Sequence, residues 1–241
     1  MCTIVVVRGG LVPGAFEIYA NRDEALDRRW QMPTLRRRGG RKILAPRDQE
    51  AGGSWLGVND AGVFVGLTNR FGCPSPPEAK SRGRLVLKGL EADSAEEAAH
   101  QLQGIDGSAY GGFHFVATDA SGIHLLWADG EMLHTHRVQQ EAWVVSERSY
   151  GAADSQRLRR WQKRLADLEE RSPDEEQWRI WLAEHSSNAP FEGTCVHLDE
   201  RNYGTRSSAI IKRRKGQWEF KHSDGPPCRG TYRAFEHLLE S

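Results

Sequence analysis

The chain has 241 residues with 33 acidic and 33 basic side chains, so its formal net charge is zero. This balance argues against a protein that binds nucleic acid through overall charge, and no apolar run approaches the roughly 20 residues that a membrane-spanning helix needs. Four scattered cysteines without a Cys-x-x-Cys pair fit neither a disulfide scaffold nor a zinc ribbon. We therefore expect no metal site and a reducing, cytoplasmic location.

The amino-terminal segment predicts a strand that begins at a cysteine. Residues 4–7 are β-branched, too few and too stiff for a helix, and typical of a strand buried on both faces. The short apolar start is followed at once by Arg8, which does not fit a signal peptide. We expect removal of Met1, which would leave Cys2 with a thiol and a free α-amino group. The amine titrates near pH ~8 and the thiol near ~8.5, so the amine can act as base for the thiol. The alternative is that Cys2 is only a small apolar residue at a chain end.

A second strand is predicted over residues 15–20, after a turn at residues 9–14, and it forms a hairpin with the first strand. It runs into the polar tetrapeptide at residues 21–24. Residues 25–50 are rich in Arg, Pro and Gly and are expected to form a long surface loop. The basic run over residues 36–42 lacks interleaved aromatic residues, so it indicates a solvated loop and not a nucleic-acid site.

The rest of the chain alternates between groups of strands and pairs of helices. Residues 52–59 and 63–69 predict strands joined by a tight turn at residues 60–62, so Asn69 ends a strand. Further strands are expected over residues 112–119, 122–129, 131–138, 143–146, 194–197, 207–212 and 218–221. Helices are expected over residues 81–90, 94–103, 154–170, 173–185 and 231–239, with Ser94 as an N-cap and Pro173 at a first helical position.

This order of elements predicts an α+β fold. Strands joined by short turns favour antiparallel sheets, because parallel neighbours need crossover connections. Helices that arrive in pairs would cover outer faces. The economical arrangement is a four-layer αββα sandwich with two stacked antiparallel sheets between helix layers. Without internal repeats or a low-complexity linker, the chain is expected to form a single domain over residues 1–241.

Five short motifs occur in order between residues 1 and 208. They are Met1-Cys2, Asn21-Arg22-Asp23-Glu24, Gly52-Gly53-Ser54-Trp55-Leu56-Gly57-Val58-Asn59, Leu67-Thr68-Asn69 and Tyr203-Gly204-Thr205-Arg206-Ser207-Ser208. The ordered set resembles the NRDE family, also called the Transport and Golgi organisation protein 2 family. The resemblance implies the fold of N-terminal-nucleophile (Ntn) hydrolases, whose choloylglycine hydrolases and penicillin V acylases use a cysteine after methionine against amide bonds. It also implies an association with Golgi organisation, lipid homeostasis and haem homeostasis.

The resemblance implies a set of catalytic roles. Cys2 would attack the carbonyl carbon of an amide in a small or lipid-like substrate, with its α-amine moving the proton and no cofactor required. Arg22 would lower the pKa of the thiol, and Asp23 would hold the α-ammonium group. Asn69 resembles the amide donor of the oxyanion hole, which is worth roughly 3 kcal/mol of the barrier, and Arg206 matches a second arginine near the nucleophile. The alternatives are an ion pair between Arg22 and Asp23 that closes a turn, and a solvated Arg206.

Three further residues are expected to contact the substrate: Asn21, Trp55 and Glu147. Glu147 departs from the family pattern, because relatives carry Ser-Asn at the end of the strand over residues 143–146 and supply a second oxyanion donor there. An ionised carboxylate accepts hydrogen bonds and cannot donate one. Either Glu147 points elsewhere, or it is protonated, or the hydrolytic mechanism is impaired.

Two hypotheses without catalysis stay open. A carrier would bind haem or a lipid-like ligand near Cys2, with Cys195 and His197, or His134 and His136, as candidate axial ligands on one strand face. Such pairs are more often surface or core residues, and nothing in the chain matches Cys-x-x-Cys-His. The other hypothesis is a protein-interaction scaffold on an inherited hydrolase fold. The sequence does not indicate an oligomeric state.

Overall fold

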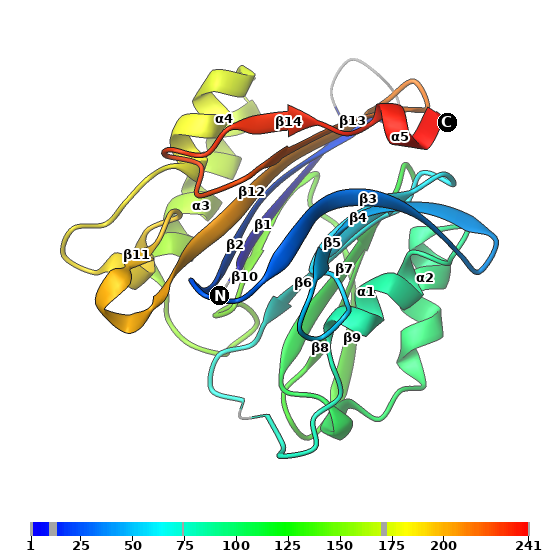
Figure 1. Cartoon of the computed structure of the whole chain (residues 1–241), viewed down its shortest axis with the longest axis horizontal. Coiled ribbons are helices and arrows are strands. Elements are labelled where there is room, and N and C mark those ends of the chain that lie inside the picture. Colours follow the sequence, from blue (N-terminus) through cyan, green and yellow to red (C-terminus); the bar gives the residue numbers. More distant parts are fainter. Residues whose placement is uncertain (1, 10–13, 74, 170–172, 241) are drawn as a thin grey trace.

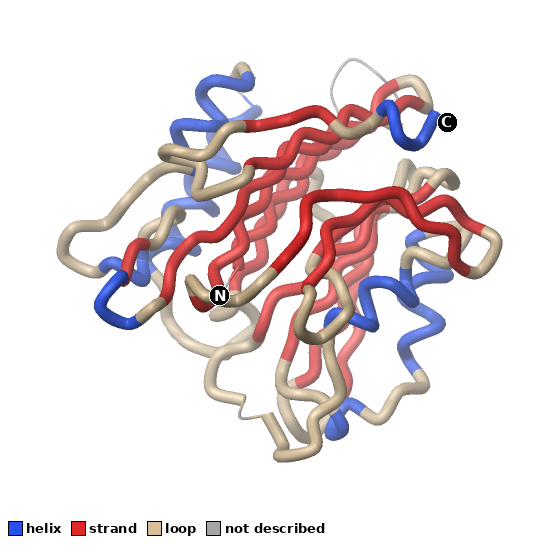
Figure 2. Tube along the Cα trace, viewed as in Figure 1, coloured by secondary structure: helices blue, strands red, loops and turns tan. Residues whose placement is uncertain are grey.

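Two antiparallel sheets lie face to face in the computed structural model, which describes residues 2–9, 14–73, 75–169 and 173–240. Helices cover the outer face of each sheet (Figure 1). In Figure 2 the strands occupy the middle of the molecule and the longer helices lie on its two outer sides. The predicted α+β fold with four αββα layers is therefore confirmed.

The first sheet has the strand order β10-β1-β2-β12-β13-β14, and β11 pairs with β12. Its strands are β1 Cys2–Arg8, β2 Phe16–Ala25, β10 Ala142–Ser146, β11 His197–Leu198, β12 Tyr203–Arg214, β13 Gln217–Ser223 and β14 Tyr232–Ala234. β1 is an inner strand between β10 and β2, as the β-branched run predicts. The predicted turn after β1 includes residues 10–13, which lie outside the described residues.

The second sheet follows the chain in the order β3-β4-β5-β6-β7-β8-β9. Its strands are β3 Trp30–Arg38, β4 Arg41–Asp48, β5 Leu56–Asn59, β6 Phe64–Asn69, β7 Phe113–Thr118, β8 Ile123–Ala128 and β9 Leu133–Val138. Asn69 ends β6, as predicted.

Each sheet has its own pair of helices. α1 Gly83–Gly89 and α2 Ala95–Gln103 cover the second sheet, whereas α3 Gln156–Ala166 and α4 Glu175–Leu182 cover the first (Figure 1). Four short 3-10 turns span Gly107–Ala109, Asp167–Glu169, Pro190–Glu192 and Asp199–Arg201, and α5 His237–Glu240 closes the chain. Ser94 caps α2 by accepting a hydrogen bond from the backbone N–H of Glu97, as predicted. Within the described residues, every helix is too short or too polar to span a membrane.

The layers enclose three hydrophobic cores, and strand alternation distributes residues among them. In β1, Ile4 and Val6 enter the core between the sheets, whereas Val5 enters the core under α3 and α4. In β7, Phe115 packs under α1 and α2, whereas Val116 faces the other sheet. This period of two places successive side chains on opposite faces of each sheet.

The predicted loop over residues 25–50 is wrong, because most of it forms the hairpin β3–β4 at the edge of the second sheet. The turn uses Gly39 and Gly40, with φ of +54° and +82°, and two left-handed residues suit the twist of a two-residue hairpin. The arginine run obscured the strand pattern, since charged side chains on an edge strand are tolerated and discourage edge-to-edge pairing.

Other boundaries also differ from the prediction. Residues 231–239 form the strand β14 followed by α5 instead of one helix, and only His197 of the predicted strand over residues 194–197 is in β11. Helix α4 begins at Glu175, because Asp174 is its N-cap and accepts from the N–H of Gln177. Ser172, which precedes the predicted start at Pro173, lies outside the described residues.

Candidate active site

The register of three neighbouring strands brings Cys2 and Arg22 together. Cys2 pairs with Arg22 across β1 and β2, and Arg22 pairs with Ser207 across β2 and β12. Directly opposed residues of antiparallel strands point to the same face of the sheet. Arg22 contacts Trp55, which directly precedes β5 of the facing sheet, so both Cys2 and Arg22 are directed between the sheets.

A cavity of about 240 Å³ opens at this end of β1. Five of the eight predicted site residues line it: Cys2, Arg22, Asp23, Trp55 and Asn69. The lining also contains charged residues that sequence reasoning missed, namely Glu24, Arg28, Asp48, Lys80 and Arg82. Asp48 and Arg28 lie in the segment predicted as a loop, so the sequence pattern did not predict that they would line this cavity.

Arg22 is buried and only partly paired. Its guanidinium carbon lies 4.3 Å from the centre of the Trp55 ring, and Nη2 lies 3.5 Å from a carboxylate oxygen of Glu24 and of Asp48. Nη1 is buried and makes no hydrogen bond to a described residue. Burial lowers the pKa of Arg22, while Glu24, Cys2 and Asp48 raise it. An unpaired buried N–H is costly, so this donor is suited to an anionic group in the cavity.

Several groups act in opposite directions on the pKa of the Cys2 thiol. Burial raises the pKa of this thiol, and the negative charge of Asp23 acts in the same direction. The positive charge of the amino terminus lowers the pKa most, followed by that of Arg22 and a hydrogen bond from the backbone N–H of Asp23. Arg22 is therefore one of the groups that favour the thiolate.

The Asp23 carboxylate is anchored toward the helix layer. It accepts a hydrogen bond of 2.6 Å from the Thr205 hydroxyl and one of 3.3 Å from Nη1 of Arg157, a residue of α3. Asp23 follows Arg22 in the strand, and successive side chains point to opposite faces. The expected contact with the α-amine of Cys2 stays a prediction, because residue 1 lies outside the described residues.

Asn69 lies at the end of β6, opposite Phe113 of β7. It lines the cavity with Cys2, and its side-chain amide makes no hydrogen bond within the described part of the chain. The amide N–H groups are therefore available to a ligand oxygen in the cavity.

A close approach of two glycines builds the cavity wall. A Cβ atom on Gly53 would lie 2.4 Å from the carbonyl carbon of Gly83, and the Ser54 N–H donates to the Gly83 carbonyl over 3.1 Å. Any side chain at Gly53 would push the start of α1 away. This contact explains the glycine two residues before Trp55.

Asn21, which was expected to contact the substrate, does not line the cavity. Its side-chain amide donates to the carbonyl oxygens of Leu182 and Thr194 over 2.9 and 2.8 Å. Asn21 thus fastens the end of α4 to the first sheet.

Glu147, the second residue expected to contact the substrate, also lies outside the cavity lining. Its Oε1 lies 3.2 Å from Nη2 of Arg157 and 3.7 Å from Nε of Arg148. Of the three alternatives for this residue, the structure shows the first, in which the carboxylate points elsewhere. Arg157 itself was missed, although its spacing of four to Trp161 placed it on the buried face of α3.

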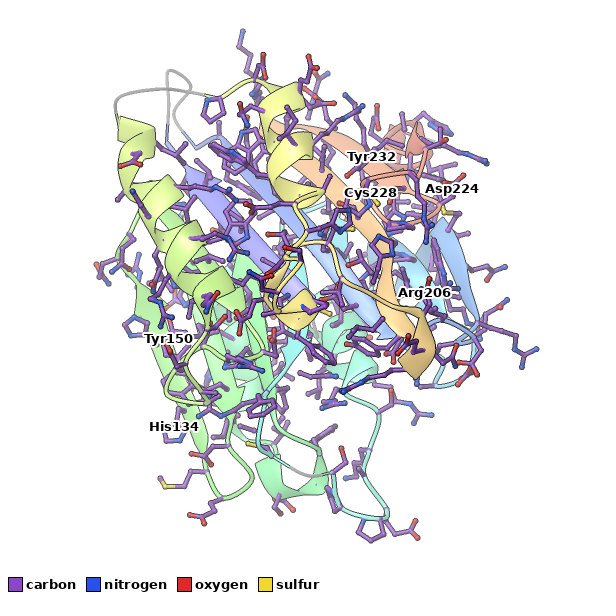
Figure 3. All side chains as sticks on the ribbon, turned by 90° about the vertical axis from the view of Figure 1, so that its left-hand side faces the viewer. His134, Tyr150, Arg206, Asp224, Cys228 and Tyr232 are labelled. Atoms are coloured by element: carbon purple, nitrogen blue, oxygen red, sulfur yellow. The ribbon has the colours of Figure 1, made fainter. Side chains whose placement is uncertain are left out.

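Arg206 is the third residue that does not line the cavity. It is the extra residue of a β-bulge between Thr205 and Ser207, near the start of β12 (Figure 3). A bulge leaves its extra residue unpaired and re-aims side chains, which a uniform strand pattern does not anticipate. Arg206 is half-buried, and its Nε makes no hydrogen bond to a described residue.

Comparisons with known proteins place this chain. The family profile of Transport and Golgi organisation 2 matches residues 1–222. The chain belongs to the Transport and Golgi organisation 2 family. Among curated members, the mouse (Mus musculus) homologue is 29% identical over 147 residues and the human (Homo sapiens) homologue 28% identical over 149 residues. Each alignment covers 60% of this chain and 52% of the relative, so this family member spans about half the length of the curated relatives it matches.

Solved structures share the fold of this Transport and Golgi organisation 2 family member. An orthologue of N-acylethanolamine-hydrolyzing acid amidase from Caenorhabditis elegans has a TM-score of 0.61 at 13% identity, covering 87% of this chain and 92% of its own. A variant of conjugated bile acid hydrolase from Clostridium perfringens has a TM-score of 0.59 at 11% identity, covering 97% and 96%. Penicillin V acylase from Agrobacterium tumefaciens has a TM-score of 0.52 at 14% identity, covering 93% and 83%. The fold is therefore Ntn-hydrolase-like.

The two residue pairs considered as haem ligands do not fit a haem beside Cys2 in this family member. Neither pair lines the cavity at Cys2. His134 stacks on Trp127 with ring centres 4.7 Å apart, and its Nε2 lies 2.6 Å from the Asp129 carboxylate. Cys195 and His197 belong to a separate cluster of side chains.

Proposed function

We propose that this chain is an Ntn-type cysteine amidohydrolase that cleaves a non-peptide amide C–N bond in a small or lipid-like substrate. The observation that carries the proposal is the cavity in which Cys2, Arg22 and the unpaired amide of Asn69 meet. The likeness in fold to an acid amidase and an acylase supports a hydrolase-like protein. The proposal includes removal of Met1, so that Cys2 carries the free α-amine.

The proposed reaction passes through a thioester. The Cys2 thiol gives its proton to its own α-amine, and the thiolate forms a sulfur–carbon bond with the amide carbonyl. Asn69 donates a hydrogen bond to the developing oxyanion. The C–N bond breaks as the amine leaves with the proton, and water then hydrolyses the thioester to a carboxylic acid and restores the thiol.

The surrounding charges suit these steps. Arg22 opposes the effect of burial on the thiol and favours the thiolate. Thr205 and Arg157 hold the Asp23 carboxylate in place beside the nucleophile. Because Glu147 is paired with Arg157, its charge is directed away from the cavity, which removes the conflict with oxyanion stabilisation.

The cavity suits the reacting end of a substrate. Its volume of about 240 Å³ is smaller than the roughly 300–1,000 Å³ of typical ligand pockets, so a long acyl chain must extend beyond it.

The test combines mass spectrometry with a substrate panel. Intact mass should show that Met1 is absent, and fluorogenic amides of increasing acyl length should be hydrolysed by the wild-type chain. Incubation with substrate should add the acyl mass to the peptide that contains Cys2. Cys2→Ser should abolish turnover, while Cys73→Ser, which changes a thiol outside the cavity lining, should retain it. Retained Met1, or equal turnover by the Cys2→Ser chain, would exclude the proposal.

A second candidate function is a carrier of an apolar ligand. A larger hollow of about 1,500 Å³ lies between the first sheet and α3, at the far end of β1 from Cys2. Its lining includes Trp143, Tyr150 and Trp178, and His136 is the one residue of the candidate haem ligands among the lining residues. Saturable Soret changes on haem titration that disappear in His136→Gln but persist in His134→Gln would favour this candidate. Identical titrations for both variants would count against it.

A further inference from the structure

Four side chains with soft donor atoms meet at the edge of the first sheet, outside the candidate active site. His185 follows α4, Cys195 precedes β11, His197 begins β11, and Cys228 lies in the turn between β13 and β14. Figure 3 shows Cys228 on this face, near Asp224 and Tyr232. The four ligand atoms all lie within 4.8 Å of one another.

The distances among Cys195, His197 and Cys228 match those around a single tetrahedral ion, and His185 completes the set of four. Sγ of Cys195 lies 3.7 Å from Sγ of Cys228 and 3.6 Å from Nε2 of His197, and Nε2 of His197 lies 3.3 Å from Sγ of Cys228. Zinc bonds of about 2.3 Å to sulfur and about 2.05 Å to nitrogen give edges of about 3.8 Å between sulfurs and about 3.6 Å between sulfur and nitrogen. A disulfide would require the two sulfurs to approach to about 2.05 Å. Both cysteines are free.

His185 is oriented for metal binding, whereas His197 must first lose one contact. Nδ1 of His185 lies 3.0 Å from the carbonyl oxygen of Cys195, so its N–H can donate there and leave Nε2 with a lone pair. Nδ1 of His197 lies 3.4 Å from Nη2 of Arg229. When Nε2 of His197 binds a metal, Nδ1 carries the proton, so this long contact with Arg229 must break.

We propose that His185, Cys195, His197 and Cys228 bind one zinc ion. Two thiolates and two imidazoles in a tetrahedron are a donor set that suits zinc. All four positions come from the protein, so the site is closed to substrate and its role is structural. The ion would tie the segment after α4 and the β13–β14 turn to β11.

Hydrogen bonds connect the proposed zinc site to Asp23, at the end of the first sheet where the cavity opens. Val196, between two of the ligands, donates its backbone N–H to the Thr205 hydroxyl oxygen over 2.8 Å. The Thr205 hydroxyl in turn donates to Asp23 over 2.6 Å. Zinc would thus stabilise the segment that holds Asp23, and this proposal does not depend on whether Cys2 is a nucleophile.

The test uses the full chain without an affinity tag, reduced and freed of metal with a chelator, with Zn²⁺ alone as the probe. One zinc per chain should bind and raise Tm, releasing protons as the thiols ionise. Co²⁺ in place of zinc should show the strong visible bands of a tetrahedral ion and a thiolate-to-metal charge-transfer band. Sub-stoichiometric zinc, or a Co²⁺ spectrum without thiolate bands, would overturn the site.

Matched variants locate the ion. Cys228→Ser and His185→Gln change two exposed ligands, and each should weaken zinc binding by more than roughly 100-fold, because loss of an outer-shell partner alone costs about 10–100-fold. Cys73→Ser and His134→Gln should bind zinc like the wild-type chain. In chelator, all of these variants should share the wild-type Tm, which separates metal loss from misfolding. Equal affinity in Cys228→Ser and Cys73→Ser, or a Cys195–Cys228 disulfide whose reduction does not produce zinc binding, would refute the proposal.

Discussion

Oε1 of Glu147 lies 3.2 Å from Nη2 of Arg157, and both side chains are at most 2% exposed. The same guanidinium lies 3.3 Å from the Asp23 carboxylate through Nη1. One buried cation on α3 therefore pairs with two anions, Asp23 of β2 and Glu147 directly after β10. Because the cation is shared, its loss weakens the electrostatic compensation of both anions.

Arg157→Met should destabilise the protein by about 3–5 kcal/mol, since removing one partner leaves buried charge uncompensated. Adding Glu147→Gln should recover part of the lost free energy of unfolding, because one of the two carboxylates that lose Arg157 as a partner becomes neutral. Urea unfolding followed by circular dichroism measures both effects. Arg159→Met, on the same helix with an exposed side chain, should change stability little. A similar loss of stability in Arg157→Met and Arg159→Met would mean that the buried ion pairs contribute no more than an exposed one.

Arg22→Met should raise the pKa of the Cys2 thiol, because the cation that favours the thiolate is gone while burial continues to disfavour it. We expect the midpoint of the alkylation-rate profile to move up by about one pH unit or more. The rate of iodoacetamide labelling at Cys2, followed by peptide mass spectrometry against pH, measures this shift. Labelling of Cys73 in the same samples is the internal reference. An unchanged midpoint would show that Arg22 does not act on the thiol.

Asn69→Ala should lower kcat by about 10²–10³-fold with little change in KM, if the amide donates to the oxyanion as proposed. Its side chain makes no hydrogen bond to described residues, so Tm should stay near the wild-type value. Steady-state kinetics with the best substrate of the amide panel provide the measurement. A rise in KM alone would instead assign Asn69 to ground-state binding.

Asn21→Ala should destabilise the fold by about 2 kcal/mol, because two buried carbonyl groups, of Leu182 and Thr194, lose their donor. Equilibrium unfolding in urea tests this, with the exposed Asn188→Ala as the matched control. Any activity should keep its wild-type KM. A changed KM at unchanged stability would restore a role in substrate binding.

His222 should make the fold sensitive to acid. Its side chain is fully buried, and burial lowers its pKa from 6.5 to about 3. Between these values the unfolded chain binds more protons than the folded chain, so stability is present above pH 6.5 and falls as the pH drops toward 3. The free energy of unfolding lost by this group between neutral pH and pH 4 is about 2–3 kcal/mol.

The measurement for His222 compares urea unfolding at the two pH values. His222→Leu should show a correspondingly smaller loss in acid, whereas the exposed His100→Gln should behave like the wild-type chain. An identical acid loss in His222→Leu would assign the sensitivity to other groups, among which His114 also has a lowered pKa, of about 4.

The order of layers could be predicted from the sequence because it depends on local patterns. The period-two alternation through Ile4 and Val6 and the short turns between strands are properties of a few neighbouring residues. The same holds for the approach of Cys2 to Arg22, which follows once β1 and β2 form a hairpin. In β3 a run of arginines hid the alternation of apolar and polar residues, and the strand was therefore not predicted.

The membership of each site was decided by tertiary structure. Asn21 precedes Arg22 yet points into the helix layer, and the bulge at Arg206 removes that residue from the cavity lining. The cluster of His185, Cys195, His197 and Cys228 joins residues separated by 10, 2 and 31 positions. Periodicity assigns a side chain to a face, but only register, bulges and the packing of layers determine which faces and loops converge.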